Sequence, residues 1–531
     1  MHAHKLVITE QESAKELFFM ENYTVMSTEQ RFSDRAEKDV EVTLTLPDYL
    51  PNCVKIIRCD AKPAISEKNL RDGNLTICGK LNMRLLYISD YNDKPKCFSD
   101  SRDFSHDFIP KTDLSDENTV IGTEVSLISC PCKMLSARQL QCTPRISLNV
   151  FANCAETHKL YDPSDGKNDG VCAKTEQTAV CEKSYIEPVS DTLQTQINLE
   201  NGEPNISEIL CTDAEPVITS ATCRDGAADY SGYTDIHCIY EAEQSDEEQT
   251  EPAYFAVKRR VEFSGSVDMP GITPDSKAVL VPEVFMTDSG ISYDPYGENR
   301  IITLNVQYIV SGSLYNCGIT EICTDAFGTK YKCDAKYGVQ TIEKLTEFIN
   351  TKAQVNEKIH ADLRQFREIT DSTATCKVTG IENSENKVFA NIKANVTLFG
   401  TAENGSLSSA DYSFGCKVPI DNVKPYPDSR FEVDAHMDGA DFTAENGVLT
   451  CNASISLVGA QTQREKVSAV ESCEVDKDAN LSDGKAQIIV YYPDKDETLW
   501  EIAKTYAVDP EQLQNDNSEN SRILIIAKHK N

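Results

Sequence analysis

Cysteine and histidine are the side chains through which this chain of 531 residues could bind a transition metal, and it has 20 cysteines and eight histidines. Zinc sites commonly use ligand pairs with the spacing Cys-x-x-Cys. No such pair occurs, and the nearest cluster is Cys130-Pro131-Cys132 followed by Cys142. We expect these cysteines to be small buried hydrophobic residues, so we predict no metal and no cofactor. Metal binding at this cluster is the weaker alternative.

Oxygen ligands for a calcium ion occur in residues 162–169, where three aspartates and a serine lie close together. The segment matches the start of an EF-hand loop only loosely, because Lys167 intervenes and the glutamate at the twelfth position is missing. We therefore expect a turn-rich linker. The motifs Gly-x-Ser-x-Gly, His-Glu-x-x-His and Gly-Lys-Ser/Thr are all absent, so we predict that the protein is not an enzyme. A β-sandwich hydrolase with a scattered site is the alternative.

The last 45 residues carry the most specific candidates for a binding site. The runs 488–491 and 523–526 predict two strands, and two helices are expected between them. Thr498 and Glu501 form a capping-box pattern, and Leu499, Ile502 and Tyr506 follow at helical spacing. Asp509 and Pro510 predict the cap and first position of the second helix. The expected order is strand, helix, helix, strand.

This tail resembles a LysM domain through Tyr491 and the run Thr498-Leu499-Trp500-Glu501-Ile502-Ala503-Lys504-Thr505-Tyr506. It departs from the family pattern where Lys495-Asp496-Glu497 replaces Pro-Gly-Asp and where the closing Pro-Gly-Gln is absent. Both differences fall in the loops that bind N-acetylglucosamine chains in sugar-binding members, so the resemblance implies a protein partner instead. The partner-binding residues that it implies are Thr498, Leu499, Trp500, Ile502, Tyr506 and Asn515. Trp500, the only tryptophan, either packs within this small domain or anchors a partner.

The charge of the chain excludes several classes of partner. There are 85 acidic and 52 basic residues, and the net charge is −33. Such a surface repels the nucleic-acid backbone, and no apolar run of about 18 residues predicts a membrane span. Glu10, Glu12 and Lys15 interrupt any apolar stretch that a signal peptide needs. We therefore expect a cytoplasmic protein with reduced thiols.

Internal repeats define the organisation of the rest of the chain. Residues 60–65 match residues 213–218 at an offset of 153, and Gly79 with Gly232 and Tyr87 with Tyr240 share that offset. In a third, diverged copy, residues 391–399 occupy the place of residues 79–87. Alternating apolar and polar residues, as in 81–85 and 302–310, predict antiparallel strands. Helical spacing is confined to a few places, including a short helix expected over 342–348.

The predicted fold is therefore mainly β, with three tandem β-sandwich-like domains followed by a small α+β (βααβ) domain. The expected boundaries are 1–155, 199–316 and 359–460 for the repeats and 487–531 for the LysM-like domain. Connectors are expected at 156–198 and 317–358, and a linker at 461–486. An acidic loop is expected at 245–252, inside the second repeat.

The repeats resemble the SPOCS domain of spore-coat assembly proteins. The resemblance rests on an Ala-x-Pro strand, an Asp-Gly turn, a Phe-Ile element at Phe108-Ile109, and the closing strands 145–150 and 300–306. It implies a non-enzymatic scaffold of spore-coat assembly in the mother-cell cytoplasm, at the forespore surface. Through the LysM-like domain, this scaffold would bind a SpoIVA-like coat morphogenetic ATPase, alongside other coat proteins. A cell-wall or cortex protein that binds peptidoglycan is the alternative, and it would need export or cell lysis.

Overall fold

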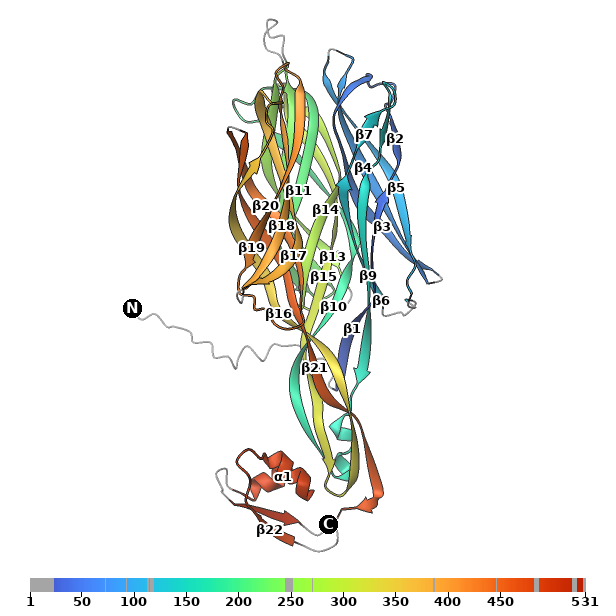
Figure 1. Cartoon of the computed structure of the whole chain (residues 1–531), viewed down its shortest axis with the longest axis vertical. Helices are drawn as coiled ribbons and strands as arrows, with labels where there is room; N and C mark the ends of the chain where they lie inside the picture. The colour runs from blue at the N-terminus through green and yellow to red at the C-terminus, as the bar shows by residue number, and fades with distance from the viewer. Residues whose placement is uncertain are drawn as a thin grey trace, which may run out of the picture.

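The computed structural model describes residues 23–71, 73–91, 93–111, 114, 119–243, 252–269, 271–384, 387–445, 447–481, 487–517 and 523–528. Residues 245–251 of the expected acidic loop and 482–486 of the expected last linker lie outside this set. The structure is mainly β, as predicted, and its strands pair in antiparallel sheets (Figure 1). None of the described helices is long and apolar enough to cross a membrane.

One strand arrangement occurs three times along the chain. Each unit has one sheet of three consecutive strands, β3-β4-β5, β11-β12-β13 or β17-β18-β19, and a second sheet, β1-β9-β6, β10-β15-β14 or β16-β21-β20. The first unit has an additional small sheet, β2-β8-β7. The strands of the first unit are β1 Thr24–Asp39, β2 Val42–Thr45, β3 Cys53–Arg71, β4 Asn74–Ser89, β5 Pro95–Phe108, β6 Thr119–Ser129, β7 Cys132–Met134, β8 Gln139–Cys142 and β9 Arg145–Lys159. Those of the second are β10 Val171–Asn198, β11 Ile206–Arg224, β12 Ala227–Ala242, β13 Tyr254–Asp268, β14 Lys277–Tyr293 and β15 Asn299–Gly328. Those of the third are β16 Tyr331–His360, β17 Glu368–Ser384, β18 Lys387–Thr401, β19 Leu407–Ile420, β20 Ser429–Glu445 and β21 Val448–Asn480.

Each unit buries the apolar faces of its two sheets against each other. In the first unit, Leu81 and Met83 of β4 share one core with Ile146 and Leu148 of β9. The alternation that predicts β4 as a strand is therefore the alternation that places every second side chain in this core.

The strand register confirms the repeat at an offset of 153 residues. The strands β3 and β11 both have 19 residues, and β4 and β12 both have 16. The alignment expected for the third copy is wrong by one residue. Thr401 pairs with the first residue of β19 as Ile88 pairs with the first residue of β5. Phe399 therefore occupies the position of Leu86 and not that of Tyr87.

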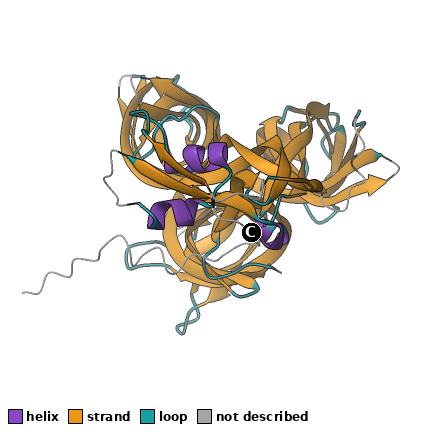
Figure 2. Ribbon diagram, turned by 90° about the horizontal axis from the view of Figure 1, so that it is seen from below, coloured by secondary structure: helices purple, strands orange, loops and turns teal. Residues whose placement is uncertain are grey.

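The three units surround a common axis. Leu86, Ile239 and Phe399 are equivalent residues of the three units, and they lie together in one buried cluster. Each unit also meets the next through an equivalent pair of strands, β5 with β11, β13 with β17 and β19 with β3. Seen along the long axis, the molecule has three strand bundles around a shared centre (Figure 2). The arrangement is a pseudo-threefold ring.

An ion pair links the two strands at each of these three junctions. The Nζ of Lys96 lies 2.5 Å from a carboxylate oxygen of Glu208, and that of Lys258 lies 2.9 Å from Asp371. Arg58 closes the ring with a contact of 2.5 Å to Asp411. The third unit therefore packs against the first unit through β19 and β3, and the ring is closed.

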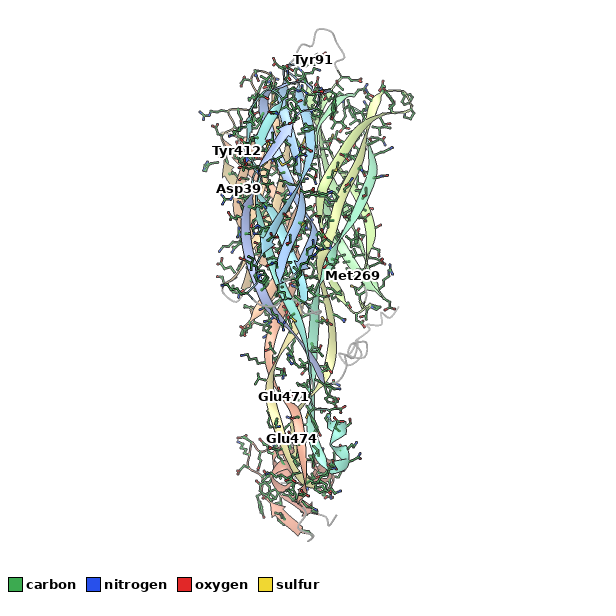
Figure 3. All side chains as sticks on the ribbon, turned by 90° about the vertical axis from the view of Figure 1, so that its right-hand side faces the viewer. Asp39, Tyr91, Met269, Tyr412, Glu471 and Glu474 are labelled. Atoms are coloured by element: carbon green, nitrogen blue, oxygen red, sulfur yellow. A yellow bond between two sulfur atoms is a disulfide. The ribbon has the colours of Figure 1, made fainter. Side chains whose placement is uncertain are left out.

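The segments expected as connectors are largely strands and not loops. The strands β10, β15, β16 and β21 have 28, 30, 30 and 33 residues, and they run beyond the sandwiches into a narrow stalk (Figure 1). A strand of 30 residues spans about 100 Å at roughly 3.3 Å per residue. Figure 3 shows Glu471 and Glu474 on this stalk, where Glu474 pairs with Lys336 at 2.5 Å. The expected turn-rich segment forms two short 3-10 turns, Pro163–Asp165 and Lys167–Asp169.

Two further expectations about the stalk are wrong. Residues 342–348 form part of β16 and not a helix. The residue between Leu345 and Glu347 is a bulge, so Leu345 and Phe348 lie three apart in sequence yet pack in one cluster. The expectation of reduced thiols also has an exception, because Cys333 and Cys473 form a disulfide between β16 and β21.

Candidate partner-binding site in the C-terminal module

Residues 487–517 and 523–528 form a small module at the end of the stalk, which we call the C-terminal module (Figure 1). Its elements are β22 Gln487–Tyr491, α1 Leu499–Tyr506, α2 Pro510–Asn515 and β23 Leu524–Lys528, and the two strands pair antiparallel. The order of strand, helix, helix and strand is the predicted one. That this module is a LysM-like domain stays a prediction.

The caps of both helices follow the predicted pattern. The backbone N–H of Glu501 donates to Thr498 Oγ1 at 3.3 Å, and the backbone N–H of Thr498 donates to Glu501 Oε2 at 2.8 Å. This reciprocal pair satisfies amide groups that have no partner within the helix. Asp509 caps α2 through the N–H of Glu511, and Pro510 occupies the first helical position.

The core of the module uses some of the residues that were expected to bind a partner. Ile502 is 1% exposed and packs with Ala503, Leu513 and Ile526. Tyr506 is half-buried, and its ring meets the ring of Tyr491 edge-on at 5.4 Å. These side chains hold the helices on the two-stranded sheet.

Trp500 attaches the module to the tip of the stalk. Its ring meets Phe327 of β15 edge-on, with a centroid distance of 5.0 Å. Its Nε1–H donates to Asp325 Oδ2 at 2.7 Å, and Lys504 Nζ donates to Asp325 Oδ1 at the same distance. Tyr337 of β16 also donates to this carboxylate, at 2.5 Å. We call Asp325, Phe327, Tyr337, Trp500 and Lys504 the module clamp.

The electrostatics of the module clamp favour a charged Asp325. Burial alone would raise the pKa of this carboxyl group, because desolvation penalises the anion. Hydrogen bonds from Lys504, Trp500 and Tyr337 outweigh that effect and lower the pKa below its ordinary value. Burial lowers the pKa of Lys504, but its contacts with Asp325 and Tyr337 outweigh that effect and raise this pKa, so both charges are retained.

An exposed apolar surface lies on the face of the β22–β23 sheet that points away from the helices. Ile489 and Tyr491 turn inward, while Ile488 is 77% exposed and Tyr492 68%. Val490 pairs with Ile525 across the two strands, and both are exposed. We call these residues the outer strip: Ile488, Val490, Tyr492, Ile523 and Ile525. Contiguous exposed apolar residues of this kind mark protein-interaction surfaces.

The outer strip was not among the residues expected to bind. The signal was present, since 488–492 is apolar on both faces of the strand, whereas a strand that covers a small core needs only one apolar face. Of the expected residues, Thr498, Leu499 and Asn515 are exposed, and Leu499 is 39% exposed. Trp500 and Ile502 face the stalk tip and the module core. Partner binding by any of the six stays a prediction.

Residues 205–291 match the family model of the SipL SPOCS domain. The chain therefore carries a SipL SPOCS domain. The match covers β11, β12 and β13 and most of β14, which belong to the second unit of the ring. The match also indicates a protein related to the spore coat. No curated protein and no solved structure matches the chain.

The family match assigns residues of the second unit only. The relation of the first and third units to it rests on their strand topology. The first and third units share its two-sheet arrangement and its junction contacts. That they too are SPOCS domains stays a prediction, as do the domain boundaries. The C-terminal module lies outside the matched residues.

Proposed function

We propose that this protein is a non-enzymatic scaffold of spore-coat assembly, which binds a SpoIVA-like coat morphogenetic ATPase through its C-terminal module. The observation that carries the proposal is the SipL SPOCS domain in a chain whose far end presents an apolar strip. The proposed location is the mother-cell cytoplasm at the forespore surface. Other coat proteins would bind elsewhere on the ring of units.

The position of the module supports a docking role. The long strands carry it away from the three units, and the module clamp fixes its orientation through Asp325 and Trp500. A partner that covers the outer strip would bury aliphatic and aromatic side chains at about 25 cal/mol per Å². The refined expectation is that the outer strip, together with Leu499, forms the contact, and that Trp500 positions the module.

The test is recovery of the coat ATPase from sporulating cells with the full chain as bait. Val490→Thr combined with Ile525→Thr replaces two paired apolar side chains by polar β-branched ones, of nearly the same shape at position 490 and slightly smaller at position 525. We expect recovery to fall about tenfold, which corresponds to a loss of about 1.4 kcal/mol of binding free energy. The matched control is Val339→Thr, which changes a residue that is 67% exposed on the stalk.

Two results would contradict the proposal. One is undiminished recovery of the ATPase by the double variant or by a chain without residues 487–531. The other is strong retention of the parent chain on purified peptidoglycan, which would support the glycan-binding alternative instead.

A further inference from the structure

Four cysteines from distant parts of the first unit converge at one end of its sandwich. Cys59 is on β3, Cys132 on β7 and Cys142 on β8, and Cys130 lies just before β7. The Sγ atom of Cys59 lies 3.5 Å from that of Cys142 and 3.7 Å from that of Cys130. The sulfur atoms of Cys59, Cys132 and Cys142 all lie within 4.8 Å of one another.

These separations fit a tetrahedral metal site. A zinc–sulfur bond of about 2.3 Å places the sulfur atoms of a tetrathiolate site roughly 3.8 Å apart. The observed distances from Cys59 are close to that value, and they are far above the roughly 2.05 Å of a disulfide bond. The thiols of Cys59, Cys132 and Cys142 are therefore placed for shared coordination of an ion and not for pairwise bonding, and Cys130 supplies a fourth thiol beside Cys59.

The cysteines occur where the fold needs a crosslink. The small sheet β2-β8-β7 has strands of only three or four residues, and within the described residues neither other unit has a counterpart. The register places Thr212 and Ser372 at the positions equivalent to Cys59. The thiol is thus specific to the unit that carries the small sheet, which lies at the upper end of that unit in Figure 1.

We propose that Cys59, Cys130, Cys132 and Cys142 bind one Zn²⁺ ion, which fastens the small sheet to β3. Thiolate sulfur is the ligand that zinc prefers in closed structural sites, and four thiolates in a tetrahedron leave no open position for catalysis. Binding would release the thiol protons to water, so the ion replaces the hydrogen bonds among the sulfur atoms. The role is structural and concerns the first unit alone, so it does not rest on the proposed function.

The first experiment measures zinc in the full chain, purified with a reductant from cells grown with zinc. We expect one ion per chain by elemental analysis, and a loss of most of it in Cys142→Ser and in Cys130→Ala. The matched control is Cys78→Ser, a half-buried thiol on β4 of the same unit, which should keep the ion. Far-UV circular dichroism reports whether each variant is folded.

The second experiment separates ligation from packing. Cys130→His keeps a ligand that zinc accepts, so it should retain the ion that Cys130→Ala loses. Cobalt in place of zinc should give the spectrum of a tetrahedral thiolate site, and this spectrum should change in Cys130→His. A folded, reduced parent chain without stoichiometric zinc would overturn the proposal. So would zinc retained by Cys142→Ser, iron in place of zinc, or four thiols found as disulfides.

Discussion

Among single residues, Asp325 has the most partners at the stalk tip. Its carboxylate accepts hydrogen bonds from Trp500, Lys504 and Tyr337, which come from two separate parts of the chain. Hydrogen bonds to a charged group are worth about 1.5–3 kcal/mol each when buried, and less where water competes. Because its side chain is about one-fifth exposed, we expect the module clamp to contribute about 1–2 kcal/mol to docking.

The first prediction concerns acid and uses Trp500 as the probe. The pKa of Asp325 is lower in the folded protein than in an unfolded chain, so its contribution is present above the ordinary value of about 3.9. The stabilisation that Asp325 gives to the docked module is lost as the pH falls through the lowered pKa of the folded protein. We expect Trp500 fluorescence to shift to longer wavelengths in that range, and Asp325→Asn to show part of the shift at pH 7. The control is Asp334→Asn, an exposed residue on the next strand, β16. A parent spectrum that does not change with acid would contradict this prediction.

At the scale of elements, close approach of two strands explains a repeated glycine. A Cβ atom on Gly232 of β12 would lie 1.9 Å from the carbonyl oxygen of Val217 on β11, so the strands would have to separate. Gly79 has the same place in the first unit, where the added atom would lie 2.5 Å from the oxygen of Ala64. The repeat at these two positions is thus a packing requirement.

The second prediction follows from that contact. Gly232→Ala should lower the stability of the second unit by about 1–3 kcal/mol, the usual cost of overpacking. Gly380→Ala is the matched control, since its Cβ would meet nothing within 4 Å in β17. The midpoint of urea unfolding, followed by circular dichroism, should fall for the first variant and stay level or rise slightly for the second. Equal midpoints would show that β12 can move away at no cost.

Local sequence patterns predicted most of the helices and strands. The predictions failed where contacts between residues far apart in the sequence determine the structure. Strand alternation in β4 and the caps of α1 are local, so both were predictable from sequence. The bulge near Leu345 imitated helical spacing, because the extra residue moves Phe348 to the same face. Trp500 meets Asp325 across 175 positions, and Cys59 meets Cys142 across 83, so neither contact has a local signature.

At the scale of the whole molecule, the ring of three units depends on one shared core. Leu86, Ile239 and Phe399 meet at the axis, and Leu210 and Tyr254 fill the space around them. Two of the junction ion pairs, Arg58–Asp411 and Lys96–Glu208, are partly exposed, so each is expected to contribute less than about 1 kcal/mol. In the third, the side chain of Asp371 is only 1% exposed, so loss of Lys258 would leave a buried charge without this partner. The apolar cluster therefore holds the ring, and the ion pairs fix which edge meets which.

The last prediction separates the stability of the ring from that of a unit. Phe399 is 1% exposed, and Phe399→Ala should lower the free energy of unfolding by about 3–5 kcal/mol. Most of this loss should weaken the packing of the three units at the axis. Leu148→Ala removes a side chain that is also 1% exposed but lies inside the first unit, at about 2–5 kcal/mol. In mild denaturant, X-ray scattering should show expansion of the Phe399 variant while its circular dichroism stays native, because the units separate before they unfold. The Leu148 variant should lose its compactness and its native circular dichroism at the same denaturant concentration. If the Phe399 variant stays as compact as the parent until its strands melt, the units hold each other by other contacts.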